Sequence, residues 1–166
     1  VNLYAKNIKN CNKKDVSKAS ELVVSFYKDQ TYIYTSQLIN ELKSRNYHLL
    51  AISGSPLEVV EEFNRSKLRF DKVFGSVYEI DKEGVYTGKV IFEPVKDKGQ
   101  LVCQYVSENN LSLKDSYGIG DTESDVSFLK LVENPIAFNP NHNLKEIAQK
   151  EKWQIVVEKK DVIYKI

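Results

Sequence analysis

The spacing of hydrophobic residues in the first third of the chain predicts two consecutive helices. Residues 1–14 are polar, rich in asparagine and lysine, and show no clear period. Asp15 is a candidate N-cap for the first helix and Ser36 for the second. The apolar positions at helical spacing are Leu22, Val23 and Phe26, followed by Leu38, Ile39 and Leu42. Two helices without an intervening strand predict a small helical lobe, which we place at residues 1–45.

From residue 47 onward the pattern changes to short apolar runs. YHLLAI predicts a buried strand that ends at the turn-forming SGSP, after which Pro56 suits the first turn of a helix. KVFGSVYEI and VYTGKVIF, joined by DKEG, predict a β-hairpin. The remaining predicted elements are a helix from about Lys98, a strand over 115–121, a helix through 126–131, a strand over 134–140, a helix over 142–150 and a strand over 153–157.

This alternation of strands and helices predicts an α/β fold with a mostly parallel sheet and helices on both faces. Ligands of such sheets bind beyond the carboxyl ends of the strands. The loops SGSP and GDTESD should meet there.

Length, charge and hydrophobicity exclude several classes of protein. The 166 residues suit one domain with a small accessory lobe, and a net charge of +1 argues against a nucleic-acid-binding protein. No apolar run is long enough to span a membrane. Two distant cysteines, Cys11 and Cys103, favour a cytoplasmic location. The chain opens at Val1 and contains no methionine, so we expect that further residues precede it.

The strongest chemical signal is GDTESD at residues 120–125. If a helix begins near Asp121, then Asp121 and Asp125 lie one turn apart on the same side of it. Carboxylates in this arrangement suit Mg²⁺, which binds one or two of them together with phosphate and water. The alternative is that Asp121 only caps the helix and Asp125 is solvated.

Two further signals indicate an anion site. Ser53 and Gly54 follow a strand, where a hydroxyl and exposed backbone N–H groups can hold a phosphate, although such residues are also common in ordinary turns. Lys96 and Lys98 precede a helix, and either could bring an ammonium group to a phosphate.

Taken together, these motifs resemble the haloacid dehalogenase-like superfamily of phosphohydrolases. That family places a serine after an apolar strand, then a lysine before a helix, then Gly-Asp-x-x-x-Asp after a further strand. FDKVFGSVYEIDKEGVYTGKV and the tail from FLKLVENPIAFNP are similar to its phosphoserine phosphatase-like branch. The resemblance implies a three-layer Rossmann-like core with a β-hairpin and a partial helical cap. It favours Lys98 over Lys96, since Lys98 lies 23 residues before Asp121.

The resemblance also implies a role for each residue in a magnesium-dependent phosphatase acting on a small phosphorylated metabolite. Ser53 and Gly54 would donate hydrogen bonds to the phosphoryl group, and Lys98 would neutralise its charge. Asp121 would hold Mg²⁺, and Asp125 would complete the acidic pocket and orient Lys98. All of these groups would have to meet at one end of the sheet.

Two departures from the family pattern matter. The family's nucleophile belongs to an Asp-x-Asp motif on the first, central strand, and this motif is absent from the 166 residues. We therefore expect residues 46–166 to be a core without its first strand and this chain alone to be inactive, with the nucleophile upstream. A non-catalytic phosphate-binding or regulatory domain is the alternative. Phosphoserine-specific members usually carry asparagine where this chain has Ser124.

Other classes have little support in the sequence. The glycine patterns of dinucleotide and P-loop sites are absent. His48 and His142 lie in different predicted elements and offer no zinc-like spacing. The sequence predicts neither the substrate nor the oligomeric state.

Overall fold

The computed structural model describes residues 1–159 and 162–165, and the chain divides into two compact units. The first unit comprises Val1–Thr31 and Leu38–Val95, and the second comprises Tyr32–Gln37 and Lys96–Ile166. Helix α3, Ile33–Ser44, contributes residues to both. The boundary that we place near residue 45 stays a prediction.

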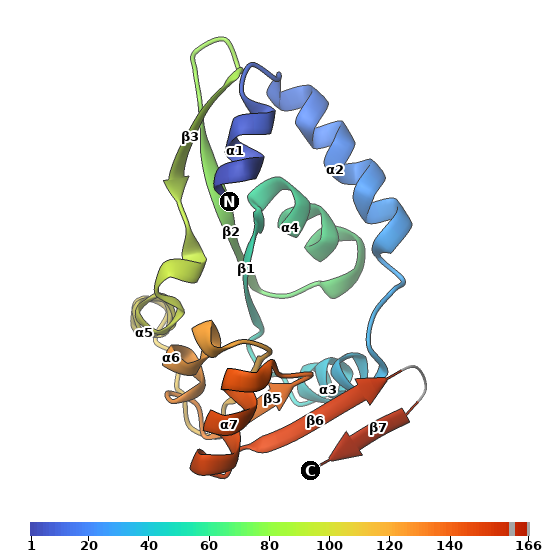
Figure 1. The fold of residues 1–166 in the computed structure, drawn as a ribbon, viewed down its shortest axis with the longest axis vertical. Helices are drawn as coiled ribbons and strands as arrows, with labels where there is room; N and C mark the ends of the chain where they lie inside the picture. The colour runs from blue at the N-terminus through green and yellow to red at the C-terminus, as the bar shows by residue number, and fades with distance from the viewer. Residues whose placement is uncertain (160–161, 166) are drawn as a thin grey trace. The chain divides into compact units, whose positions relative to one another are not determined.

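A three-stranded sheet forms the centre of the first unit (Figure 1). Its strands are β1 (Leu50–Pro56), β2 (Lys72–Ile80) and β3 (Tyr86–Phe92). β1 pairs in parallel with β2, and β2 pairs antiparallel with β3. The predicted hairpin is confirmed. β1 starts later than predicted and runs through the whole of SGSP, which the sequence pattern assigns to a turn.

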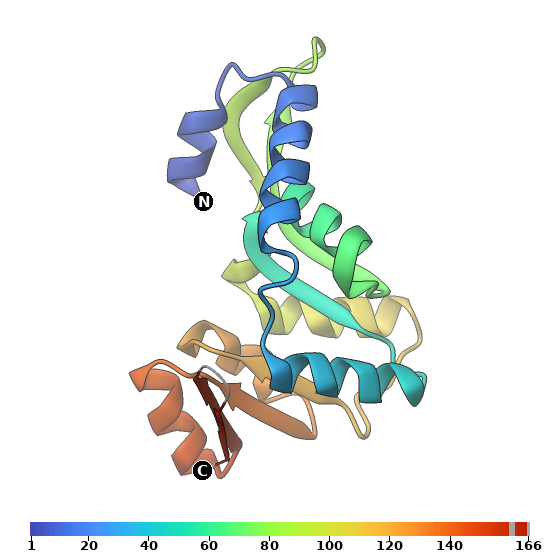
Figure 2. The same ribbon diagram turned by 90° about the vertical axis from the view of Figure 1, so that its right-hand side faces the viewer.

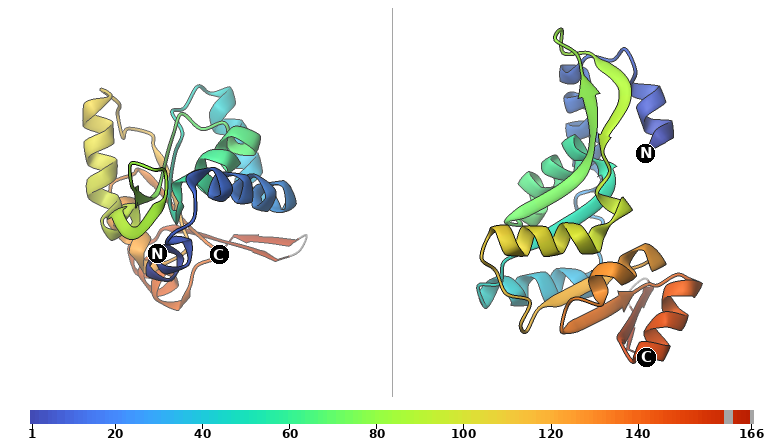
Figure 3. Two further views of the ribbon diagram at one scale, coloured as in Figure 1. Left: turned by 90° about the horizontal axis from the view of Figure 1, so that it is seen from above. Right: turned by 90° about the vertical axis from the view of Figure 1, so that its left-hand side faces the viewer.

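Three helices pack on this sheet and on one another. They are α1 (Asn2–Ile8), α2 (Lys13–Tyr27) and α4 (Leu57–Phe63), which continues into a π-helical turn over Asn64–Leu68. α4 packs against β2 on one side and against α2 on the other (Figure 2). α1 lies beside β3, as the right-hand view of Figure 3 shows.

The start of the chain differs from the sequence prediction in two ways. α1 was not predicted, because seven residues are too few to establish a helical period. α2 begins earlier than predicted, and its N-cap is Asn12 rather than Asp15, since the Asn12 side chain accepts a hydrogen bond from the N–H of Lys14 at 2.9 Å. Asp15 lies instead within the first turn, where a carboxylate favours the positive end of the helix dipole.

The hydrophobic core of the first unit joins α1, α2 and the hairpin. Its buried members are Ala5, Ile8, Val16, Tyr78 and Tyr86. The Tyr86 hydroxyl, in a side chain only 1% exposed, donates a hydrogen bond of 2.5 Å to Glu58 Oε1 on α4. Burial, and next this hydrogen bond, raise the pKa of the Tyr86 phenol. The pair therefore links the hairpin to the helix that follows β1.

The second unit is built on a four-stranded sheet in the order β4-β5-β6-β7. The strands are β4 (Tyr117–Gly120), β5 (Asn134–Phe138), β6 (Gln154–Lys159) and β7 (Val162–Lys165). The helices are α5 (Lys98–Glu108), α6 (Val126–Leu129) and α7 (His142–Glu151). β4, β5 and β6 are parallel, and β7, which was not predicted, pairs antiparallel with β6. The buried core comprises Leu129, Ala137, Leu144, Ala148 and Ile155.

Helix α3 shows how a distant residue can set a helix boundary. The sequence predicts Ser36 as its N-cap, but the helix begins at Ile33. The buried carboxylate of Glu158 on β6 accepts hydrogen bonds from the N–H groups of Ile33 and Tyr34 at 2.7 and 2.8 Å. This partner, more than 120 residues away, satisfies the free N–H groups that a local cap would otherwise take.

The predicted α/β class with parallel strands is confirmed. Within residues 1–159 and 162–165, β1 is the end strand of one sheet and β4 is the end strand of the other. Among these residues, each helix is too short or too polar to span a membrane.

We expect Tyr86→Phe to lower the free energy of unfolding by about 1.5–3 kcal/mol, because it removes a hydrogen bond to a carboxylate in a buried setting. Urea unfolding followed by circular dichroism measures this change. Tyr27→Phe, at an exposed position of α2, is the matched control and should leave the transition midpoint unchanged. Equal effects of the two substitutions would contradict the structural role of the Tyr86–Glu58 hydrogen bond.

Candidate active site

The loop that follows β4 carries the acidic residues predicted as the centre of the site. β4 ends at Gly120, a 3-10 turn covers Glu123–Asp125, and α6 begins at Val126. The helical segment thus begins at Glu123 with Thr122 as its N-cap, and Asp121 lies before it, so the two aspartates do not stack along one helix face. Asp125 instead folds back on the loop that precedes it.

The Asp125 carboxylate is almost fully buried and is surrounded by donors. Its Oδ2 accepts hydrogen bonds from the N–H groups of Asp121 at 2.9 Å and Thr122 at 3.1 Å. Its Oδ1 accepts from Lys98 Nζ at 2.5 Å. The alternative in which Asp125 is merely solvated is wrong, since its side chain is 4% exposed. Buried charges of this kind need such partners, because removal from water is costly.

Gly120 is required by the position of Asp125. A Cβ atom on Gly120 would lie 2.4 Å from Asp125 Cβ and 2.7 Å from its carboxylate carbon, both far inside van der Waals contact. The glycine of the GDTESD motif thus makes room for the carboxylate that closes the loop.

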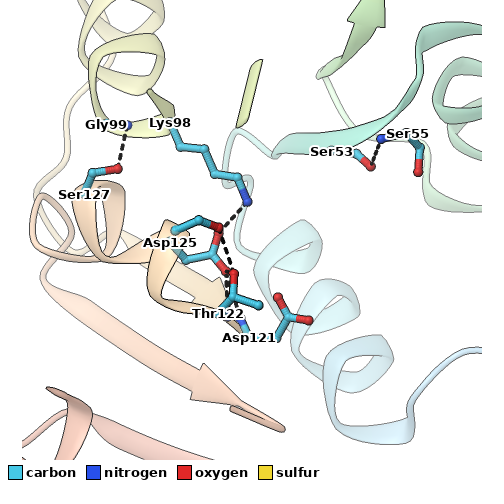
Figure 4. A network of polar contacts seen from close by, with 9 residues as sticks. Ser53, Ser55, Lys98, Gly99, Asp121, Thr122, Asp125 and Ser127 are labelled. Atoms are coloured by element: carbon cyan, nitrogen blue, oxygen red, sulfur yellow. Dashed lines mark hydrogen bonds and ion pairs between the residues drawn. The ribbon is translucent and has the colours of Figure 1, made fainter. Parts of the chain in front are cut away.

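Lys98 enters the site from the first turn of α5. Asp97 caps this helix by accepting a hydrogen bond from the N–H of Gln100 at 2.9 Å. The Lys98 side chain is 12% exposed and ends at Asp125 (Figure 4). Lys96, in the preceding turn, is exposed. The N–H of Gly99 also donates to Ser127 Oγ at 3.1 Å, which joins α5 to α6. The geometry favours Lys98 over Lys96 as the lysine of the site.

Asp121 is exposed at the carboxyl end of β4. No cluster of three or more metal-ligating side chains occurs among the residues that the structure describes. One exposed carboxylate is nevertheless the donor type that Mg²⁺ takes from a protein when phosphate and water complete its shell. Asp121 therefore fits as one ligand of such an ion, with the remaining ligands supplied from elsewhere.

Ser53 and Gly54 lie within β1, in the first unit, directly after the residues that pair regularly with β2. Ser53 Oγ accepts a hydrogen bond from the N–H of Ser55 at 3.1 Å, which leaves its own hydrogen to donate (Figure 4). Ser76 Oγ on β2 donates to the Gly54 carbonyl at 2.9 Å, and a Cβ on Gly75 would lie 2.6 Å from Leu57 Cα. Close contact with β2 therefore fixes this segment.

Of the predicted residues, the structure brings Lys98, Asp121 and Asp125 together in the second unit. Ser53 and Gly54 belong to the first unit, so the expected meeting of all five stays a prediction. The side chains of Asn141 and Glu123, which were not predicted as part of the site, are hydrogen bonded to each other. The position of Asn141 directly before a predicted helix is a capping signal that could have revealed it.

Comparison with known proteins agrees with these features. The family model described as haloacid dehalogenase-like hydrolase matches residues 3–130. A protein of Methanocaldococcus jannaschii named phosphoserine phosphatase is 31% identical over 128 residues, which cover 76% of this chain and 57% of that protein. The chain spans about half the length of the curated relatives it matches.

Solved structures show the same fold. A protein of unknown function from Bordetella pertussis Tohama I superposes with a TM-score of 0.80 at 21% identity, covering 93% of this chain and 71% of that chain. A substrate-bound phosphoserine phosphatase complex superposes with a TM-score of 0.59 at 29% identity, covering 75% of this chain and 57% of that chain.

We expect Asp125→Asn to destabilise the second unit by about 3–5 kcal/mol, because it leaves the Lys98 ammonium buried without its charge partner. Urea unfolding monitored by the fluorescence of Trp153, in the same unit, reports the loss. Glu151→Gln breaks an ion pair with Lys130 in the same unit, whose side chains are 41% and 55% exposed, and should leave the midpoint nearly unchanged.

The double substitution of Lys98→Met with Asp125→Asn should recover part of the lost stability, since it removes the unpaired charge. An Asp125→Asn protein as stable as the wild type would show that the ion pair does not hold this site together.

Proposed function

Because the chain belongs to the haloacid dehalogenase-like hydrolases, we propose that it supplies most of the catalytic machinery of a magnesium-dependent phosphomonoester hydrolase. The observation that carries this proposal is the buried Lys98–Asp125 pair beside the exposed Asp121 carboxylate. The name of the 31% identical relative, phosphoserine phosphatase, supports the same reaction class.

Each residue has a part that follows from its chemistry. Lys98 places a positive charge, fixed by Asp125, where negative charge accumulates on a transferring phosphoryl group. Ser53 and the backbone N–H of Gly54 supply hydrogen-bond donors to the same group. Asp121 would hold Mg²⁺, which when bound polarises a phosphoryl oxygen. Since preorganised charges need no rearrangement during the reaction, the rigid Lys98–Asp125 contact suits this task.

The nucleophile in this proposal is an aspartate upstream of these 166 residues. Its carboxylate oxygen bonds to phosphorus as the ester oxygen leaves, and water then cleaves the aspartyl-phosphate to release inorganic phosphate. Two observations support it. The chain contains no Asp-x-Asp, and β1 and β4 each have a neighbour on one side only within the described residues. A further strand beside either of them would satisfy its free backbone groups.

The substrate class that we propose is a small phosphorylated metabolite. Phosphoserine itself stays open, because Ser124 stands where phosphoserine-specific relatives usually carry asparagine. Ser124 Oγ lies 2.8 Å from Thr122 Oγ1, so the two hydroxyls are hydrogen bonded to each other within the loop. A cytoplasmic location, suggested by the two cysteines, belongs to the same proposal.

For a longer protein that includes the upstream residues, we expect hydrolysis of p-nitrophenyl phosphate to require Mg²⁺. Asp121→Asn should lower kcat/KM by at least about a hundredfold, since it keeps the shape of the side chain but removes the charge that attracts the cation. Asp15→Asn, on the exposed first turn of α2, is the matched control and should leave turnover unchanged. Full activity in excess chelator would contradict the proposal.

For the 166-residue chain alone, we expect no hydrolysis of p-nitrophenyl phosphate above background, because the nucleophile is absent while the binding groups remain. The assay compares this chain with the longer protein at equal concentration and saturating Mg²⁺. Equal turnover would show that the nucleophile lies within residues 1–166. Absence of turnover in both would favour the phosphate-binding alternative.

A further inference from the structure

The loop after β5 is bonded to the loop that carries Asp121. The N–H of Asn141 donates to the Asp121 carbonyl at 2.8 Å. Its side-chain Nδ2 donates to Glu123 Oε2, and its Oδ1 accepts from the N–H of Leu144 at 2.9 Å, which caps α7. One asparagine thus connects the backbone of Asp121, the side chain of Glu123 and the start of α7.

Glu123 accepts the side-chain hydrogen bonds that link the two loops. Its Oε1 accepts from Asn143 Nδ2 at 3.3 Å, so both carboxylate oxygens accept hydrogen bonds from side-chain amides at the start of α7. The hydrogen bond from Asn141 is the main cause that lowers the pKa of the Glu123 carboxyl. With both oxygens occupied, Glu123 is better suited to brace the loop than to bind a metal.

The backbone of Asp121 is consequently fixed on both sides. Its N–H is held by Asp125 Oδ2 at 2.9 Å, and its carbonyl is held by the N–H of Asn141. Its carboxylate, in contrast, is exposed, and no hydrogen bond or ion pair of this group is found within residues 1–159 and 162–165. Since no group among these residues holds the carboxylate itself, the position of the carboxylate depends on how firmly the Asp121 backbone is held.

We propose that Glu123 and Asn141 are positioning residues that set the Asp121 carboxylate for a divalent cation, an inference that rests on the proposed function. Metal ligands must be held within about 0.5 Å of their productive geometry, and loss of an outer partner commonly costs 10–100-fold in metal affinity. In this role, the hydrogen bond between Asn141 and Glu123 acts through the loop backbone, and neither residue binds the metal or the substrate.

The first test measures loop motion in the 166-residue chain. Hydrogen exchange of the Asp121 and Thr122 amides should become at least about fivefold faster in Glu123→Ala, because the hydrogen bonds of Glu123 with Asn141 and Asn143 no longer restrain the loop. Glu123→Gln keeps an acceptor for Asn141 and should restore most of the protection. Glu146→Ala is the control, since Glu146 is an exposed glutamate of α7 that pairs with His142.

The second test measures metal affinity directly, by electron paramagnetic resonance titration of Mn²⁺ into the longer protein. Glu123→Ala should raise the dissociation constant about tenfold or more, while Glu123→Gln and Glu146→Ala stay near the wild-type value. In the hydrolysis assay, the Mg²⁺ concentration for half-maximal rate should rise by a similar factor. The substrate KM at saturating Mg²⁺ should not change.

These outcomes separate the inference from the function it rests on. Unchanged exchange in Glu123→Ala, or faster exchange with unaltered Mn²⁺ affinity, would overturn the positioning role. If the longer protein binds Mn²⁺ through Asp121 but hydrolyses no phosphomonoester, the proposed function fails while the exchange and titration results still decide the role of Glu123. Loss of Mn²⁺ binding in Asp121→Asn identifies that ligand independently.

Discussion

The ion pair between Lys98 and Asp125 is the interaction on which the candidate site depends. Asp125 neutralises a nearly buried ammonium group and, with its other oxygen, holds the N–H groups of Asp121 and Thr122. A carboxylate in this position cannot be removed without leaving a buried positive charge, so the start of α5, the loop after β4 and the start of α6 are organised together. The requirement extends to Gly120, because any larger residue would collide with the Asp125 side chain.

The polar residues around this pair lie where parallel strands end, which is the usual place for a ligand in an α/β sheet. Asp121 follows β4, and Asn141 lies in the loop after β5. Asp125 fixes the position of the Lys98 ammonium group. Within the second unit, the fold thus supplies a fixed cation, an exposed carboxylate and a braced loop, which suits the handling of phosphate.

Much of this arrangement could be predicted from the sequence, because the elements involved leave local signals. The hairpin, the helix from Lys98 and the strand before GDTESD are confirmed, since alternation, turn residues and helical spacing each act over a few residues. The burial of the acidic loop was not predictable in the same way. Asp125 Oδ2 turns back to its own loop in a local capping box with Thr122, but the partner of Oδ1, Lys98, lies 27 residues earlier, which no local pattern contains.

The start of α3 was mispredicted for the same reason, since Glu158 of β6 takes the place that a local cap would fill. Division of the parallel strands between two sheets also depends on pairing between distant segments, which no local pattern contains.

The central claim is that Lys98, oriented by Asp125, marks the position of the phosphoryl group. The most direct test is a crystal structure of the longer protein with Mg²⁺ and inorganic phosphate. The account predicts phosphate within hydrogen-bond distance of Lys98 Nζ and Ser53 Oγ, with Asp121 bound to the metal. Phosphate bound away from Lys98, with the Lys98–Asp125 pair unchanged, would contradict it.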